Sequence, residues 1–91
     1  MNYHIAICDD EQEYINKVEF IVKEYFQNSN NTYQLYKYLN GKNLLKDISM
    51  FNIIFLDIQL KNINGLDIKN KLSKYHDLRI IFVTNYEQYM Q

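Results

Sequence analysis

The sequence contains a single cysteine, no proline, no tryptophan and almost no excess of charge of either sign. Because Cys8 has no second thiol to pair with, an internal disulfide is excluded. The formal net charge of -1 provides no field that would draw the chain to nucleic acid or to an acidic membrane surface. No signal-peptide pattern opens the sequence either, so we expect a cytoplasmic protein.

Long hydrophobic runs are also missing. The longest, 53–56 and 80–83, are far shorter than the roughly 20 apolar residues that a membrane-spanning helix needs. They are typical of buried strands, and we expect no membrane contact. With 91 residues and 47% hydrophobic content, the chain has enough apolar material for one small core. We therefore predict one domain, 1–91.

Strand-like and helix-like segments alternate along the chain. Apolar runs predict strands at 4–8, 33–38, 53–56 and 79–84, and apolar residues at steps of three and four predict helices at 11–27 and 66–75, with a short helix after 40–41. This alternation predicts an α/β fold, in which an open parallel sheet has helices on both sides. The uninterrupted run at 53–56 favours a central strand that is covered on both faces.

The helix predicted at 11–27 has one apolar stripe and two expected ion pairs. The apolar positions are Tyr14, Ile15, Val18, Ile21, Val22, Tyr25 and Phe26. Glu13 with Lys17, and Glu19 with Lys23, stand four residues apart, the spacing at which opposite charges support a helix.

Acidic residues stand where the first and third predicted strands end. Asp9 and Asp10 follow 4–8, Asp57 follows 53–56, and Thr84 closes the fourth strand. In open parallel sheets, ligands bind beyond the carboxyl ends of the strands, so these side chains should meet in one crevice. Crowded carboxylates repel one another unless a cation neutralises them, and Mg²⁺ prefers oxygen ligands. No cluster of cysteine and histidine points to zinc.

The same residues suggest phosphoryl chemistry. A carboxylate held beside a magnesium ion can attack a phosphoryl group, so Asp57 is a candidate for an aspartyl phosphate. The Thr84 hydroxyl is then placed to donate to a phosphoryl oxygen and to act as a switch. A simpler interpretation is open for Asp10 and Glu11, which could only cap the following helix.

Three motifs in this order resemble response-regulator receiver domains. They are Ile5-Ala6-Ile7-Cys8-Asp9-Asp10-Glu11, then Ile54-Phe55-Leu56-Asp57 with Gly65-Leu66-Asp67, and Ile81-Phe82-Val83-Thr84. The resemblance implies a flavodoxin-like sheet of strand order 2-1-3-4 and a sensor histidine kinase that phosphorylates Asp57. It also implies that Asp9, Asp10, Asp57 and the main-chain carbonyl of Gln59 hold Mg²⁺, and that Thr84 is the switch hydroxyl. The sequence around Cys8 and after Thr84 is similar to that of receivers that precede a LytTR-type DNA-binding domain.

Two departures from the family pattern affect the expectations. Receivers have a fifth strand that begins with a lysine, but no lysine follows Lys74 here. We therefore expect a receiver domain that is incomplete at its C-terminus, without the fifth strand and last helix, and DNA contact only through a missing output domain. The loop 61–64 also lacks the proline that family members often have.

Without a fifth strand, the predicted strand at 79–84 becomes a sheet edge. We expect self-association through this strand or its neighbouring helix, or otherwise poor stability. Two other functions stay open: a receiver that never accepts phosphate and only docks or dimerises, and a phosphohydrolase with an aspartate nucleophile. The second needs an acid two residues after Asp57, where Gln59 stands, so we expect no enzyme.

Other conspicuous residues are expected to be structural. Cys8 is expected to pack in the core rather than to take part in redox chemistry. Neither His4 nor His76 has a partner histidine, so we expect surface or edge residues. The nine tyrosines lack interleaved arginines, which favours half-buried packing over a stacking platform for nucleic acid.

Overall fold

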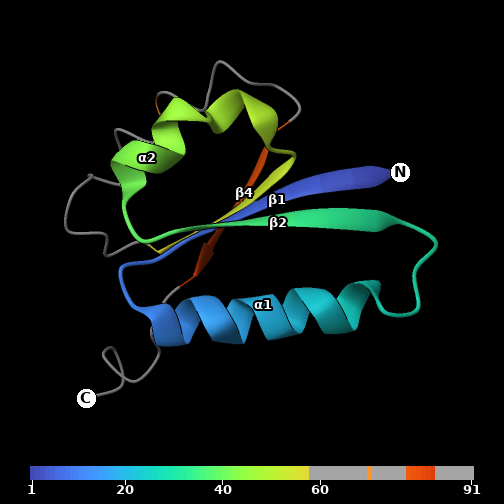
Figure 1. Cartoon of the computed structure of the whole chain (residues 1–91). Helices are drawn as coiled ribbons and strands as arrows, with labels where there is room; N and C mark the ends of the chain where they lie inside the picture. Colours follow the sequence, from blue (N-terminus) through green and yellow to red (C-terminus); the bar gives the residue numbers. More distant parts are fainter. Residues whose placement is uncertain (58–69, 71–77, 84–91) are drawn as a thin grey trace.

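A computed structural model describes residues 1–57, 70 and 78–83. Its elements are β1 (Asn2–Cys8), α1 (Gln12–Phe26), β2 (Thr32–Tyr38), α2 (Gly41–Lys46), a 3-10 turn η1 (Ile48–Met50), β3 (Ile53–Asp57) and β4 (Arg79–Val83). The four strands form one parallel sheet in the order β2-β1-β3-β4, with α1 and α2 on opposite faces (Figure 1). The predicted fold class and strand order are confirmed. The helix predicted at 66–75 lies outside the described residues apart from position 70.

The strand register places the carboxyl ends of β1 and β3 side by side. Cys8 pairs with Tyr38 of β2 on one side and with Leu56 of β3 on the other. Asp57 is in register with Val83 of β4. Asp9, which follows Cys8 directly, therefore emerges next to the end of β3.

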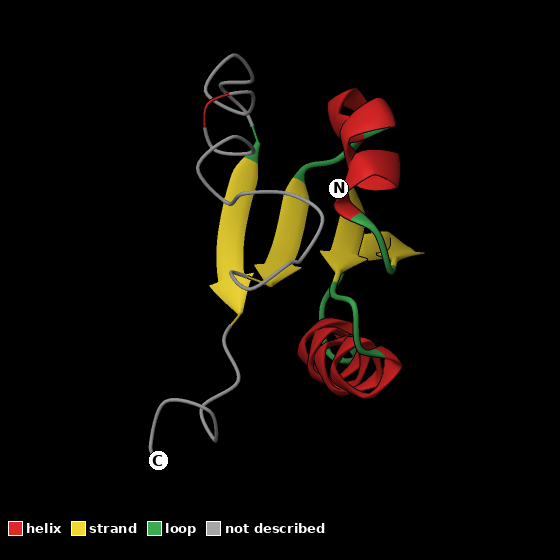
Figure 2. Ribbon diagram, turned by 90° about the vertical axis from the view of Figure 1, so that its left-hand side faces the viewer, coloured by secondary structure: helices red, strands yellow, loops and turns green. Residues whose placement is uncertain are grey.

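Helix α1 packs on the sheet through only part of its predicted stripe. Ile15, Val18 and Val22 are buried against Ile5 and Ile7 of β1. Both helices contact β1 and β2, and they lie beside that half of the sheet in Figure 2. This position leaves the far side of the stripe without a strand beneath it.

Two predictions for α1 need correction for that reason. Ile21 and Tyr25 were expected in the apolar contact, but they are 63% and 77% exposed. Glu19 was expected to pair with Lys23, but its carboxylate lies 2.9 Å from Nζ of Lys37 on β2. The second predicted pair, Glu13 with Lys17, is present at 3.7 Å.

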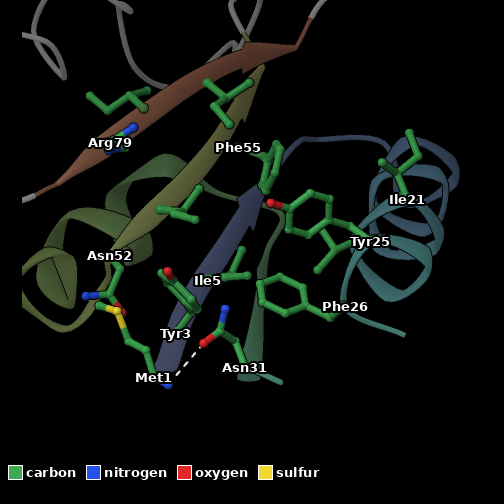
Figure 3. A pocket seen from close by; sticks show the side chains of 14 residues that line it. Met1, Tyr3, Ile5, Ile21, Tyr25, Phe26, Asn31, Asn52, Phe55 and Arg79 are labelled. Carbon is green, nitrogen blue, oxygen red and sulfur yellow. Dashed lines mark hydrogen bonds between the residues drawn. The ribbon is translucent and has the colours of Figure 1, made fainter. Parts of the chain in front are cut away.

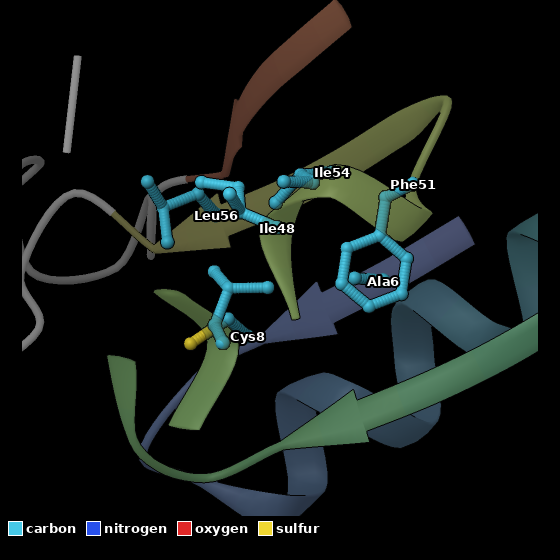
Figure 4. Packing of buried hydrophobic residues seen from close by; sticks show 7 residues of the cluster. Ala6, Cys8, Ile48, Phe51, Ile54 and Leu56 are labelled. Carbon is cyan, nitrogen blue, oxygen red and sulfur yellow. The ribbon is translucent and has the colours of Figure 1, made fainter. Parts of the chain in front are cut away.

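The face of the sheet under α2 has a continuous core (Figure 4). Its buried members are Ala6, Cys8, Leu44, Ile48, Phe51, Ile54 and Leu56. Helix α2 begins after Asn40, whose side-chain oxygen accepts the Lys42 N–H at 2.7 Å. At its other end, the Tyr38 hydroxyl donates to Asp47 at 2.9 Å.

Strand β3 is covered less evenly than its apolar sequence predicts. Ile54 and Leu56 are fully buried on the α2 side, whereas Ile53 and Phe55 on the α1 side are only half-buried among the described residues. The expectation of full cover on both faces is wrong for this part of the chain. Within the described residues no helix is long and apolar enough to cross a bilayer.

The expectations for the other conspicuous residues mostly hold. Cys8 is buried in the core, and five of the six described tyrosines are half-buried, Tyr25 being the exception. His4 lies on an inner strand, half-buried, with its ring 6.2 Å from that of Tyr36. His4 is therefore partly exposed but not an edge residue, because β1 has neighbours on both sides, and His76 lies outside the described residues.

Candidate functional site

Three carboxylates meet at the carboxyl end of the sheet. Asp9, Asp10 and Asp57 each offer one oxygen, and these three atoms all lie within 4.8 Å of one another. The fold causes this meeting, because β1 and β3 are parallel neighbours and both strands end in aspartate. Sequence and structure thus bring together the three acidic residues predicted for the site.

Asp9 is held in place by the backbone around it. It is only 7% exposed, and its N–H donates to the carbonyl of Tyr38 at 3.0 Å. Its Oδ1 accepts the N–H of Glu11 at 3.0 Å, at the start of α1. Fixed on both sides, the Asp9 carboxylate cannot turn away from Asp10 and Asp57 without breaking a hydrogen bond.

The capping interpretation of the acidic run is wrong for Glu11. Glu11 occupies the position before α1, but its side chain makes no capping hydrogen bond. The carboxylate that reaches the helix start belongs to Asp9. Asp10 is exposed, and its carboxylate contributes to the acidic cluster.

The cluster is electrostatically costly without a counter-charge. Burial, partly opposed by the Glu11 N–H and reinforced by the charges of Asp57 and Asp10, raises the pKa of Asp9 to about 6. A bound cation would oppose this shift and favour the ionised form of Asp9. The site therefore favours a positive ligand.

The donor set fits a magnesium ion. Three carboxylate oxygens from three side chains suit a hard divalent cation that prefers oxygen and keeps some of its water. The neighbouring thiol does not compete for metal, because burial, reinforced by the charges of Asp9, Asp57 and Asp10, raises the pKa of Cys8 to about 12. This matches the structural role predicted for Cys8.

Two predicted site residues, Gln59 and Thr84, lie outside the described residues. The structure also adds contacts that the sequence did not indicate: the carbonyl of Tyr38 and the N–H of Glu11, which hold Asp9. Both belong to the main chain, so no side-chain pattern could have pointed to them.

Comparisons with known proteins agree on one family. A model of the response regulator receiver domain matches residues 5–91. The chain is 35% identical over 86 residues to the regulatory protein VanR of Enterococcus faecium. It is 32% identical over 94 residues to the sensory transduction protein LytT of Oceanobacillus iheyensis. These matches cover 92% and 98% of this chain but only 35% and 37% of the two relatives.

Solved structures show the same fold. The BeF3-activated DrrB receiver domain matches 92% of this chain and 67% of its own, with a TM-score of 0.71 and 25% identity. The response regulator DrrB of Thermotoga maritima, an OmpR/PhoB homolog, matches 99% of this chain and 40% of its own, with a TM-score of 0.68 and 23% identity. The parallel sheet is therefore that of a receiver.

Proposed function

The chain belongs to the response regulator receiver domain family of two-component signalling, and on this premise we propose that Asp57 accepts a phosphoryl group. The observation that carries the proposal is the meeting of three carboxylates, within 4.8 Å of one another, at the ends of β1 and β3. An aspartate that only ends a strand would not require two further carboxylates beside it. Three together form a cation site beside a nucleophile.

In the proposed reaction, a carboxylate oxygen of Asp57 forms a bond to phosphorus while the bond between phosphorus and the donor breaks. Receivers of this family are generally phosphorylated by a histidine kinase, so we propose a phosphohistidine as the donor, with its imidazole as the leaving group. Asp57 is only partly buried, at the end of β3, which leaves it accessible to a donor. The product is an aspartyl phosphate that stays on the chain.

Asp9 and Asp10 are proposed as metal ligands beside Asp57. When bound, Mg²⁺ neutralises part of the charge on the carboxylates and on the incoming phosphoryl group. The protein contributes the positions: the hydrogen bonds from the Glu11 N–H and to the Tyr38 carbonyl fix Asp9 before any ligand arrives. We propose the carbonyl of Gln59 as a further ligand and Thr84 as the switch hydroxyl.

The role proposed for the domain is a switch and not a turnover enzyme. One phosphoryl group per chain changes the state of the domain, and a further domain reads that state. The chain spans about a third of the length of the two curated relatives. A DNA-binding output domain of the LytTR type, a cytoplasmic location and self-association through the strand at 79–83 remain proposals.

A paired measurement tests the function. First, Mg²⁺ binding by the 91-residue chain is followed by calorimetry, and we expect Asp9→Asn and Asp57→Asn each to weaken it at least tenfold. Second, the protein at the length that its gene encodes is mixed with Mg²⁺ and a small phosphodonor. We expect a mass gain of one phosphoryl group that requires both Mg²⁺ and Asp57.

Glu24→Gln is the matched control, because it removes one exposed carboxylate from α1, away from the cluster. This variant should bind Mg²⁺ and accept phosphate as the unchanged protein does. Mg²⁺ binding without any mass gain would leave a metal-binding docking module. Equal Mg²⁺ affinity in Asp9→Asn and in the unchanged protein would overturn the site itself.

A further inference from the structure

Tyr38 connects two parts of the molecule, the acidic cluster and helix α2. Its main-chain carbonyl accepts the N–H of Asp9 at 3.0 Å, directly beyond the last residue pair of the β1–β2 ladder, Cys8 with Tyr38. Its side-chain hydroxyl donates to Asp47 at 2.9 Å, where α2 ends. The main chain of Tyr38 thus contacts a proposed metal ligand, and its side chain contacts the end of a helix.

The main chain of Tyr38 is held by a strand on one side only. β2 is the first strand in the order β2-β1-β3-β4, so within the described residues β1 is its single strand neighbour. The next residue, Leu39, is 54% exposed, and α2 begins at Gly41. The position of the Tyr38 carbonyl therefore depends on what the Tyr38 side chain contacts.

The Tyr38 side chain is packed as well as hydrogen-bonded. Its ring meets that of Phe51 edge-on, with centroids 5.8 Å apart and ring planes at 79°. Phe51 is only 5% exposed and belongs to the core under α2, together with Ala6 (Figure 4). The tyrosine ring thus has two anchors, Phe51 in the core and Asp47 at the end of α2. A ring held at both places limits how far its own carbonyl can move.

Asp9 transmits this restraint to the acidic cluster. Its carboxylate accepts the Glu11 N–H at 3.0 Å, and its main-chain N–H donates to Tyr38. A shift of the Tyr38 carbonyl would displace the Asp9 main chain and move its carboxylate relative to those of Asp10 and Asp57. Because Mg²⁺ demands near-ideal octahedral geometry, a small displacement of one ligand weakens its binding.

We propose that Tyr38 and Asp47 are positioning residues for the metal site, because the hydrogen bond between them holds the carbonyl that orients Asp9. This inference rests on the proposed function, in which Asp9 is a ligand of Mg²⁺. Both residues act through Asp9 and not on the ion or the phosphoryl group. Groups that orient metal ligands directly contribute roughly 10- to 100-fold to metal affinity. The Tyr38 hydroxyl acts one step further away, so its contribution is smaller.

The coupling between α2 and the metal site acts in both directions. If the bond between Tyr38 and Asp47 strengthens Mg²⁺ binding by some factor, Mg²⁺ must stabilise that bond by the same factor. The end of α2 is then held more firmly in the metal-bound protein. Helix α2 therefore responds to occupancy of the site, although it supplies none of the three carboxylates.

Calorimetric titration of Mg²⁺ into the protein at the length that its gene encodes measures the positioning effect. Tyr38→Phe keeps the ring and removes the hydroxyl, and it should raise the Mg²⁺ dissociation constant about 3- to 10-fold. Tyr36→Phe is the matched control, because Tyr36 also lies edge-on to Phe51 but donates its hydroxyl to Gln34. This variant should bind Mg²⁺ as the unchanged protein does.

Two substitutions of Asp47 separate the hydrogen bond from the charge. Asp47→Asn and Asp47→Ala both remove the negative charge, but the asparagine side-chain oxygen can still accept the Tyr38 hydroxyl. Asp47→Asn should therefore bind Mg²⁺ more tightly than Asp47→Ala, which lacks the acceptor as Tyr38→Phe lacks the donor. Equal Mg²⁺ affinities of the two Asp47 variants would overturn the role of this bond.

Asn52→Ala distinguishes positioning from a general loss of stability. The variant loses the hydrogen bond from the His4 N–H to the Asn52 side chain. Asn52 precedes β3 at the amino ends of the strands, where Figure 3 also shows Met1, whereas the acidic cluster lies at their carboxyl ends. Asn52→Ala should therefore keep its Mg²⁺ affinity. A loss of affinity as large as that in Tyr38→Phe would indicate general loosening and overturn the positioning role.

Hydrogen exchange followed by NMR tests both directions of the coupling. Without Mg²⁺, the Asp9 N–H should exchange faster in Tyr38→Phe than in the unchanged protein, because its acceptor is held less firmly. Mg²⁺ should slow exchange of the Asp47 N–H, which donates to the Leu44 carbonyl, more in the unchanged protein than in Tyr38→Phe.

The outcomes distinguish the positioning role from the metal site itself. If the unchanged protein binds Mg²⁺ and Tyr38→Phe binds it equally well, the positioning role alone is overturned. If the unchanged protein does not bind Mg²⁺, the proposed metal site fails and the positioning role fails with it.

Discussion

β1 and β3 are neighbouring strands of similar apolar sequence, yet they are buried very differently. From Ile5 to Cys8 every side chain of β1 is at most 1% exposed. β3 alternates, with Ile54 and Leu56 fully buried and Ile53 and Phe55 half-buried. The cause is the position of α1, whose main contacts with the sheet are with β1 and β2, so that β3 lies at the margin of its cover.

The difference separates a well-covered part of the sheet from a less covered one. The β1–β2 half is sandwiched between α1 and α2, whereas in the described residues β3 is covered mainly from the α2 side and β4 has exposed apolar residues on both faces, Ile81 and Phe82. An apolar run therefore shows that a strand belongs to the sheet. It does not show how many of its faces are covered.

Alanine substitutions at Ile5 and Ile53 would test this comparison most directly. The two residues are partners in register and point to the same face. Ile5→Ala removes a fully buried side chain and should cost about 3 kcal/mol of unfolding free energy. Ile53→Ala removes a half-buried one and should cost about 1 kcal/mol.

Chemical denaturation at low protein concentration measures both values without the influence of self-association. Both variants replace isoleucine by alanine, so they differ only in how deeply the original side chain is buried. Equal losses for the two variants would show that Ile53 is as well covered in solution as Ile5. The contrast between β1 and β3 would then disappear.

Tyr38→Phe tests the attachment of α2 to the closed half of the sheet. The variant loses the hydrogen bond to Asp47 and should lose about 1.5 kcal/mol, because the acceptor is charged. Thermal unfolding at neutral pH measures the loss. Tyr36→Phe is the matched control and should lose less, since the Tyr36 hydroxyl donates to the exposed, uncharged side chain of Gln34.

The same pair of variants has a distinct pH dependence. Burial and the hydrogen bond to Asp47 raise the pKa of Tyr38 from 10.0 to about 12. Its contribution to stability is complete below pH 10 and is lost as pH rises through about 12, because the unfolded chain ionises first. The advantage of the unchanged protein over Tyr38→Phe should shrink in this window. A constant difference would show that the folded state does not protect the hydroxyl.

Asn52→Ala tests the open half of the sheet. The Asn52 side chain accepts the His4 N–H at 2.7 Å, and its main-chain carbonyl accepts the Arg79 N–H at 2.9 Å. Losing the first bond should cost about 1 kcal/mol. Asn2→Ala is the counterpart on the closed half, where the lost bond to the Thr32 hydroxyl is exposed and should cost less than about 0.5 kcal/mol.

The sheet and its acidic cluster were accessible from sequence because both depend on local patterns. Apolar runs mark strands, and parallel strands bring their carboxyl ends to one edge, so Asp9, Asp10 and Asp57 could be placed together without coordinates. The order of the strands came from the family resemblance. Neither the placement of the acidic residues nor the strand order depends on how far a helix extends over the sheet.

The features that could not be predicted depend on where elements lie relative to one another. The exposure of Ile21 and Tyr25 follows from the position of α1 over β1 and β2. The hydrogen bond between Asp9 and the carbonyl of Tyr38 uses a main-chain atom that every residue has. Helical spacing alone also could not reveal that Glu19 pairs across to β2.

Variants of the two α1 ion pairs should change the free energy of unfolding least. They test how this helix is attached to the β1–β2 half of the sheet. Glu19 lies 2.9 Å from Lys37 and joins α1 to β2, whereas Glu13 lies 3.7 Å from Lys17 within the helix. Both pairs face solvent, but the side chains of the first are 38% and 42% exposed, against 76% and 60% for the second. Glu19→Gln should cost about 0.5 kcal/mol and Glu13→Gln about 0.2 kcal/mol, with both losses smaller at high salt. Because only the first pair crosses between elements, a larger loss in Glu13→Gln would mean that the ion pair with Lys37 adds nothing to the attachment of α1 to β2.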